Sequence, residues 1–252
     1  MKPPAPLCAA AAALALLAVL QSAGCGGGTA AGPAGSDPVE SDTVFIQLEG
    51  GEFVTSEGDI VLIQPFELME TEVSNRLYVW LADEAGLDLP PDPGFPAMEY
   101  YLTAMPDYPV VNVSALEAEQ ACAVLGGRLP TLAEMEYAAS IGLSGPSAGL
   151  FPWGTLDPED AEFPANYLAS DDWDLRNQDG YLFTAPVGSF PRNPAGLADL
   201  AGNVAELTRP SDSICTVFGG SWLSPSDDLR IGTWSTIYEG DRARHIGFRI
   251  AR

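Results

Sequence analysis

Residues 127–139 read GRLPTLAEMEYAA and contain the start of a helix. Thr131 and Glu134 are spaced as a capping box, in which the threonine oxygen accepts a backbone N–H of the first turn and the glutamate reaches back to the threonine N–H. We expect this helix to continue to about Ile141. A local hydrogen-bonding rule therefore places one helix in the chain before any packing partner is known.

Two more helices are expected upstream. Ser114 and Glu117 form a second capping box, and the helix that they begin should run to Leu125 and end at the glycines of residues 126–127. Ser74 is expected to cap a further helix, because apolar residues recur at helical spacing in the residues that follow it.

Strands and irregular chain are expected around these helices. Residues 43–48 and 60–68 are rich in β-branched and aromatic side chains and predict two strands, joined by a turn at residues 49–51. Residues 144–220 show little periodicity and many Asp, Asn, Gly and Pro residues. So long an irregular stretch needs an additional constraint in a compact domain, with a bound metal as the first candidate and a disulfide as the second.

Composition and charge exclude several classes of partner. Of the 252 residues, 46% are hydrophobic and 18% are charged, which is a globular composition. The 35 acidic and 11 basic residues give a net charge of −24. Nucleic acid and anionic lipid surfaces are therefore excluded as electrostatic partners, because both require a basic face. The acidic balance suits divalent cations such as calcium, and solubility alone would also explain it.

The beginning of the sequence has the pattern of an exported lipoprotein. Residues 8–20 are almost purely Ala, Leu and Val, a run with the length of a signal-peptide core and too short to span a membrane. Small residues then lead to Cys25, which resembles the acylated cysteine of bacterial lipoproteins, although Ser22 stands where such signals usually have Leu. Ordinary signal cleavage near Ala23 is the alternative.

Three regions are expected from this pattern. They are a lipoprotein signal peptide at residues 1–24, a tether rich in Gly, Ala, Ser and Pro at residues 25–42, and one domain at residues 43–252. The expected location is the cell envelope, at the outer membrane or the periplasmic face, with the membrane contacted through the lipid anchor.

Two cysteines remain in the expected domain, Cys122 and Cys215. In an oxidising compartment a disulfide between them is the default expectation. Closing so long a loop would stabilise the fold by roughly 4–5 kcal/mol on the chain-entropy model. Two separate buried thiols are the alternative.

Eight segments, taken in order, resemble one known family. They are FELMETEVSN (66–75), PVVNVS (109–114), residues 127–139, FPWG (151–154), PVGSFP (186–191), GLADLAGNVAE (196–206), GGSW (219–222) and GFR (247–249). The series is similar to the formylglycine-generating enzyme (sulfatase-modifying factor) family over nearly all of residues 43–252. The resemblance implies an α+β fold, a formylglycine-generating-enzyme-like variant of the C-type lectin fold that is low in regular secondary structure.

The chemistry of that family does not carry over to this chain. Family members oxidise a sulfatase cysteine with molecular oxygen and with copper held by two cysteine thiolates. The resemblance places these cysteines at Ser226 and Ile231, and no cysteine follows Cys215. Soft Cu(I) needs sulfur ligands, so we expect no copper. A non-haem iron site is also excluded, because it needs more than one histidine and His245 is the single one.

Other family positions have changed as well. The resemblance places a family tryptophan at Met135 and another at Ala205. These differences point to a diverged member that kept the scaffold and lost the original catalyst.

The resemblance also implies two structural calcium sites made of oxygen ligands, as calcium prefers. The first would use side-chain and carbonyl oxygens of Asn166, Tyr167, Asp179 and Tyr181. The second would use those of Asp199, Gly202, Val204 and Glu206. The alternative is that these residues only form turns.

The sequence therefore favours a lipid-anchored, non-catalytic binding or scaffold module, a pseudoenzyme stabilised by calcium, whose ligand is an unknown protein or glycan. Its candidate binding surface comprises Asp227, Asp228, Arg230 and Trp234. One alternative is an enzyme of the same superfamily with altered chemistry, alone or with a catalytic partner. Formylglycine generation on sulfatases is the other.

Overall fold

The helices begin where their capping residues predict. The computed structural model describes residues 42–145, 149–162, 164–169 and 178–252, all within one compact unit. The helices are α2 (Asn75–Ala85), α3 (Tyr101–Ala104), α4 (Ala115–Val124), α5 (Leu132–Ser140) and the short 3-10 helix η2 (Ser226–Leu229). Both capping boxes are present, with Ser114 and Glu117 at the start of α4 and with Thr131 and Glu134 at the start of α5.

The start of the domain contains four short strands where two were predicted. β1 (Phe45–Leu48) pairs with β4 (Phe66–Met69), whereas β2 (Gly51–Val54) pairs with β3 (Ile60–Ile63). The strand expected at residues 43–48 corresponds to β1. β2 was not predicted, and the strand expected at residues 60–68 is divided into β3 and β4. The reason is that the predicted second strand is interrupted at Pro65, which has no N–H to donate to a ladder.

A glycine permits the close approach of these two pairs. Gly50 has a φ of +70°, and a Cβ atom added there would lie 2.2 Å from the carbonyl oxygen of Ile63. A side chain at this position is therefore excluded both by the backbone conformation and by space.

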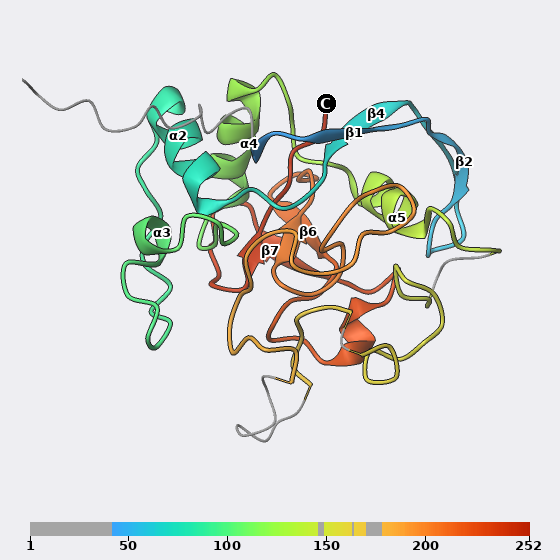
Figure 1. Cartoon of the computed structure of the whole chain (residues 1–252). Coiled ribbons are helices and arrows are strands. Elements are labelled where there is room, and N and C mark those ends of the chain that lie inside the picture. The colour runs from blue at the N-terminus through green and yellow to red at the C-terminus, as the bar shows by residue number, and fades with distance from the viewer. Residues whose placement is uncertain (1–41, 146–148, 163, 170–177) are drawn as a thin grey trace, which may run out of the picture. The chain divides into compact units, whose positions relative to one another are not determined.

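A four-stranded sheet forms the centre of the fold. Its strand order is β7 (Trp234–Tyr238), β6 (Ile214–Phe218), β5 (Ala205–Leu207) and β8 (Ile246–Gly247). β5 and β8 are parallel, and the other neighbours are antiparallel. The mixed helix and strand content confirms the predicted α+β class, with long irregular segments between the elements (Figure 1).

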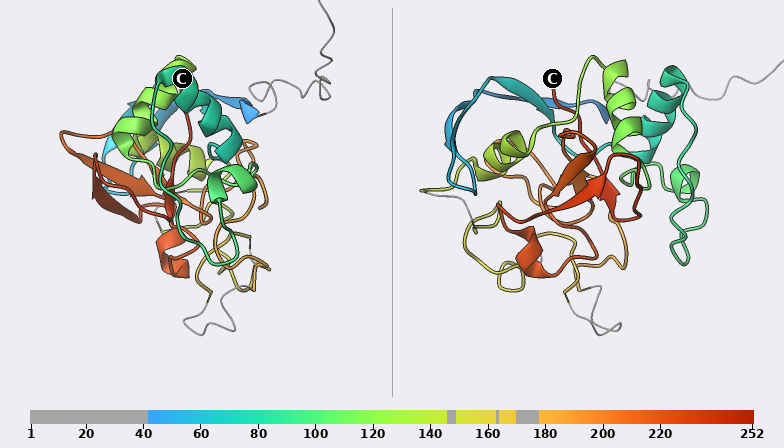
Figure 2. Two further views of the ribbon diagram at one scale, coloured as in Figure 1. Left: turned by 90° about the vertical axis from the view of Figure 1, so that its left-hand side faces the viewer. Right: turned by 180° about the vertical axis from the view of Figure 1, so that it is seen from behind.

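The core lies between the helices and the sheet. α2 and α4 lie side by side, as the views in Figures 1 and 2 show. Their apolar faces share one cluster of buried side chains with β5 and β6, including Leu77, Leu81, Leu207 and Val217. A second cluster joins α5 to β1, β3 and β4.

The two cysteines are part of the first cluster and do not form a disulfide. Cys122 of α4 and Cys215 of β6 are free thiols, and neither is exposed to solvent. The predicted bridge is therefore wrong in this structure. Each thiol packs as a small apolar side chain, which is the commonest role of a buried free cysteine. Burial accordingly raises the pKa of Cys215 to about 11.

Cys25, the expected signal peptide and nearly all of the expected tether lie outside the described residues. Among the residues that are described, no helix is both long and apolar enough to cross a membrane.

Candidate functional site

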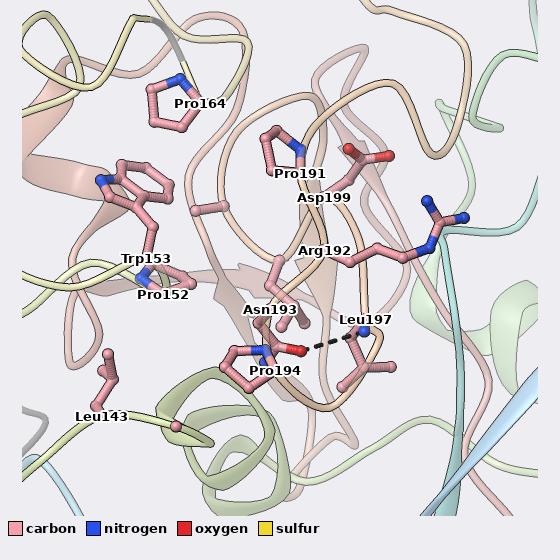
Figure 3. Close-up of a pocket in the computed structure, with 13 residues that line it drawn as sticks. Leu143, Pro152, Trp153, Pro164, Pro191, Arg192, Asn193, Pro194, Leu197 and Asp199 are labelled. Carbon is pink, nitrogen blue, oxygen red and sulfur yellow. Dashed lines mark hydrogen bonds between the residues drawn. The ribbon is translucent and has the colours of Figure 1, made fainter.

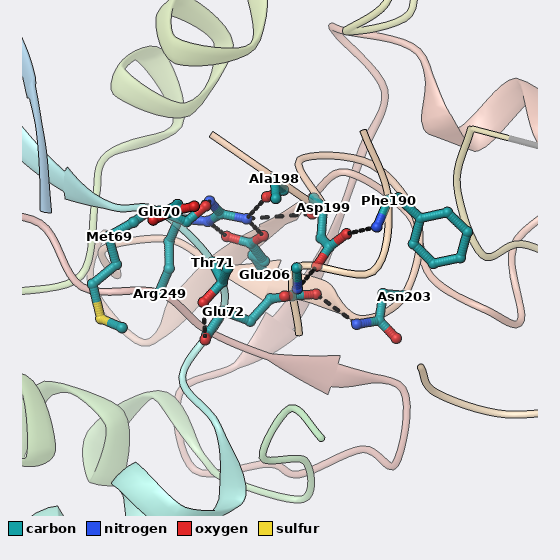
Figure 4. A network of polar contacts seen from close by, with 11 residues as sticks. Met69, Glu70, Thr71, Glu72, Phe190, Ala198, Asp199, Asn203, Glu206 and Arg249 are labelled. Carbon is teal, nitrogen blue, oxygen red and sulfur yellow. Dashed lines mark hydrogen bonds and ion pairs between the residues drawn. The ribbon is translucent and has the colours of Figure 1, made fainter. Parts of the chain in front are cut away.

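The centre of the domain holds a buried ion pair. Arg249 follows β8 and is 0% exposed, and its guanidinium donates to both carboxylate oxygens of Glu206 on β5, at 2.6 and 2.5 Å. The same guanidinium donates to the backbone carbonyls of Met69, Ala198 and Asp199, at 3.0–3.3 Å. Arg249 therefore connects three distant parts of the chain through one charged group (Figure 4).

Two further carboxyl groups lie beside this pair. The Asp199 carboxylate accepts the N–H groups of Gly188 and Phe190, the latter at 3.1 Å. Glu72 is 1% exposed and accepts from the side-chain amide of Asn203 at 2.9 Å. Burial, followed by the charges of Asp199 and Glu206, raises the pKa of Glu72 well above its ordinary value. The raised pKa favours the protonated form of Glu72, whose Oε2 atom is buried without a hydrogen-bonding partner among the described residues.

The second predicted calcium set does not fit the ion as these residues are arranged. Both Glu206 oxygens face a guanidinium, and Asp199 is directed toward backbone N–H groups (Figure 4). The positive charge of Arg249 lies where calcium would have to compete for the same oxygens. The remaining predicted ligands, the carbonyls of Gly202 and Val204, offer no charge to offset this.

The first predicted calcium set fits better. Asn166 and Tyr167 are buried, and the Asp179 Oδ1 atom accepts the N–H of Tyr181 at 2.9 Å. The Asp179 Oδ2 atom is buried without a hydrogen-bonding partner. Burial raises the pKa of this carboxyl to about 6. An oxygen in this state is suited to a cation ligand, because a bound cation would compensate the buried charge.

A calcium ion at the first set would depend mainly on amide and carbonyl oxygens. Within the described ranges, no three His, Cys, Asp or Glu side chains are grouped so as to hold a metal. Asn166, together with the carbonyls of Tyr167 and Tyr181, would have to supplement the single carboxylate of Asp179. Oxygen ligands of this kind are compatible with calcium.

The positions predicted for the family's cysteines lie in different environments. Ser226 is the first residue of η2, whereas Ile231 is 1% exposed and packs in the second core cluster. Ile231 therefore contributes to the core and does not face a groove.

A small pocket does lie beside η2. It has a volume of about 110 Å³, and Ser224, Asp228, Trp234, Ser235 and His245 are among the residues that line it. Among the described residues, no hydrogen-bonding partner is found for the side chains of Asp228, Ser235 and His245. We call this cavity the η2 pocket.

The η2 pocket presents both donors and acceptors to a ligand. Burial, followed by the charge of Arg244, lowers the pKa of His245. His245 is therefore neutral at neutral pH, with one ring nitrogen that donates and one that accepts. The Asp228 carboxylate adds acceptors, and the Ser235 hydroxyl can act either way.

The predicted binding surface divides into two parts. Asp228 and Trp234 line the η2 pocket. Arg230 instead pairs with Asp227 at 3.1 Å, and its guanidinium lies 4.2 Å from the ring centroid of Phe151. Of the four predicted residues, Asp228 and Trp234 therefore line a pocket, and the binding of a ligand there stays a prediction.

A comparison with known protein families identifies the family of the chain. Residues 31–252 match the family described as sulfatase-modifying factor enzyme 1-like domain. The chain belongs to this family.

Relatives of this chain include a protein named as a formylglycine-generating enzyme and one named as inactive. This chain is 39% identical over 177 residues to the formylglycine-generating enzyme of Mycobacterium tuberculosis, covering 56% of each chain. It is 34% identical over 157 residues to the inactive C-alpha-formylglycine-generating enzyme 2 of Bos taurus, covering 58% of this chain and 50% of that protein. The sulfatase-modifying-factor-like chain thus spans about half the length of these curated relatives.

Solved structures show the same fold. CarF superimposes with a TM-score of 0.62 at 22% identity, over 82% of this chain and 97% of that one. PvdO from Pseudomonas aeruginosa gives a TM-score of 0.61 at 23% identity, over 82% and 93% of the two chains. These structures support the sulfatase-modifying-factor-like fold alone.

Sequence reasoning on this sulfatase-modifying-factor-like chain missed several site residues. Arg249 lies in the GFR motif and Glu72 in the segment before α2, and neither motif alone identifies the residue as part of a buried charge network. The available signal at Arg249 was a charged residue between the apolar residues Phe248 and Ile250, which requires a partner if it is buried. Glu72 lies among the polar residues Glu70, Thr71 and Ser74 and has no such signal. No local pattern marks Ser235 as a pocket residue.

Replacing Glu206 by Gln should destabilise the sulfatase-modifying-factor-like domain by about 3–5 kcal/mol, because it leaves the buried Arg249 charge uncompensated. Arg242→Ala is the matched control, since it removes an arginine that is 43% exposed and pairs with Glu117. That change should cost less than about 1 kcal/mol. Urea unfolding of the three proteins measures both effects, and equal losses in the two variants would contradict the role assigned to the buried pair.

Proposed function

We propose that this protein is a lipid-anchored, extracytoplasmic binding or scaffold module without formylglycine-generating activity. The observation that carries the proposal is the absence of any cysteine after Cys215 in the sequence. The family's copper chemistry needs two thiolates, and the pocket beside η2 is lined by hydroxyl, carboxylate and imidazole groups. The similarity to an inactive family member is compatible with the same proposal.

The η2 pocket is the proposed ligand site. Its unpartnered Asp228, Ser235 and His245 side chains are suited to a polar ligand, such as a glycan or a polar segment of a protein. Groups that already have protein partners would add little to binding, whereas these three can form new hydrogen bonds.

The purified protein should not convert a sulfatase-derived cysteine peptide to formylglycine, with or without added copper. Mass spectrometry of the peptide provides the measurement. The formylglycine-generating enzyme of Mycobacterium tuberculosis, assayed on the same peptide, controls for the quality of the substrate. Conversion by the present protein above the rate without enzyme would overturn the non-catalytic assignment.

We further propose that calcium stabilises the domain at Asn166, Tyr167, Asp179 and Tyr181. A ligand bound only by the native state adds about 2.7 kcal/mol at a hundredfold excess over Kd. For a domain of this size the melting temperature should rise by about 5–10 °C. Asp179→Asn should abolish this rise, and Asp160→Asn, on an exposed loop, should leave it unchanged.

The same variant makes a second prediction of opposite sign. Because the folded pKa of Asp179 is raised to about 6, the charged form costs stability as the pH rises from about 4 through 6. Without calcium at pH 7.5, Asp179→Asn should therefore melt at a higher temperature than the parent protein. If Asp179→Asn melts at a lower temperature without calcium and is still stabilised by calcium, the proposed site at Asp179 is wrong. Thermal unfolding with calcium and with a chelator measures both effects.

The lipid anchor is tested at Cys25. Cys25→Ser should move the protein from the membrane fraction to the soluble exported fraction and should prevent labelling by a radioactive fatty acid. Cys8→Ser is the matched control, because Cys8 lies within the expected signal peptide and would be removed with it. If the two variants fractionate alike, Cys25 is not the anchor.

A further inference from the structure

A second cavity shares no lining residue with the η2 pocket. Its volume is about 280 Å³, and its walls include the rings of Trp153, Pro152, Pro164, Pro191 and Pro194 and the side chain of Leu143. Figure 3 shows the Trp153 indole facing the proline rings across the cavity. We call it the Trp153 pocket. Its lining is mainly apolar, as in small-ligand sites, and its volume is just below the range of about 300–1,000 Å³ that such sites have.

The indole is held in place from behind. The rings of Trp153 and Phe151 stack with centroids 5.0 Å apart and an interplanar angle of 2°. Arg230 in turn lies over the Phe151 ring and donates to the carbonyl of Gly149 at 3.0 Å. The indole Nε1 atom donates to the carbonyl of Leu156 at 3.0 Å. The polar edge of Trp153 is thus satisfied, and its apolar face remains available to a ligand.

The polar side chains around the cavity already have partners within the protein. Asn193 donates to the carbonyl of Ala138 at 2.8 Å and accepts two backbone N–H groups at 3.1 Å. Arg192 pairs with Glu70 at 2.5 Å, and in Figure 3 its guanidinium points away from Trp153. The hydroxyl groups of a sugar would lose their water partners here without replacement. An apolar or aromatic group would not incur this cost.

An acidic loop borders the pocket. Residues 157–162 lie in the sequence between Trp153 and Pro164, which both line the pocket, and contain four exposed carboxylates, on Asp157, Glu159, Asp160 and Glu162. Within the described part of the chain, the one arginine that reaches this loop is Arg230, whose guanidinium is 3.8 Å from Asp157. The loop therefore has a net negative charge, in a protein of net charge −24. Such a rim attracts and orients a basic partner.

We propose that the Trp153 pocket receives an aromatic side chain from a basic segment of a partner protein. The aromatic ring would stack on the Trp153 indole and fill the space between the proline rings. Lysine or arginine residues on both sides of that ring would face the carboxylates of residues 157–162. The site is separate from the η2 pocket, so its test does not depend on the ligand proposed there.

The test measures the affinity of defined peptides for the purified protein by titration calorimetry. The probe is the peptide Ac-KRFRK-NH2, and its two controls are Ac-KRARK-NH2 without the ring and Ac-EEFEE-NH2 without the positive charge. The probe should bind at least tenfold more tightly than either control, and its affinity should fall as salt is raised. Trp153→Ala should weaken the probe at least tenfold, whereas Trp234→Ala, which removes a tryptophan of the η2 pocket, should not.

A second variant tests the proposal even if Trp153→Ala does not fold. The double change Glu159→Gln and Asp160→Asn alters only exposed side chains, so the domain should fold and the probe should bind more weakly with a smaller salt dependence. If the probe and Ac-KRARK-NH2 bind with equal affinity, charge alone accounts for binding, and the proposal is overturned. Indole or Ac-EEFEE-NH2 binding as tightly as the probe would make the occupant a small or uncharged aromatic group, which also overturns it. So would an absence of probe binding at millimolar concentration.

Discussion

The buried guanidinium of Arg249 is the constraint on which the irregular part of the fold depends. A charge without solvent contact is tolerated only when every donor has a partner, and here the partners are Glu206 and the carbonyls of residues 69–70 and 198–199. These segments come from the end of β4, from the irregular chain before β5 and from β5 itself. Moving any one of them would leave a charged group unpaired, so the network fixes all three together.

Side-chain amides extend the same principle through the loops. Asn203 joins Glu72 to the backbone of Ala185, and Asn193 joins the loop before β5 to the end of α5. Sequence reasoning expected a metal or a disulfide to hold residues 144–220. The described residues instead hold much of this region with buried hydrogen bonds between side chains and backbone, and a cation at Asp179 would add to them. Each bond contributes little alone, and together they satisfy backbone groups that lack strand partners.

Features that depend on contacts between residues close in sequence could be predicted, and features that depend on distant contacts could not. The starts of α4 and α5 were predictable, because Ser114 and Thr131 bond to residues three positions away. The pairing of β1 with β4 was not, since it depends on contacts between residues about twenty positions apart. The family resemblance gave the fold and the loss of the cysteines. It could not show that Arg249 would occupy the Glu206 carboxylate, because that contact exists only in the folded chain.

Strand β5 shows how such a scaffold can keep its fold while its function changes. Successive residues of a strand point to opposite faces. Glu206 is turned toward Arg249, whereas its neighbour Ala205 lines the η2 pocket, at a position where the resemblance implies a tryptophan. The small side chain leaves open space in the pocket without touching the ion pair. Selection can therefore change the contents of the pocket at position 205 while the charge network at position 206 continues to specify the fold.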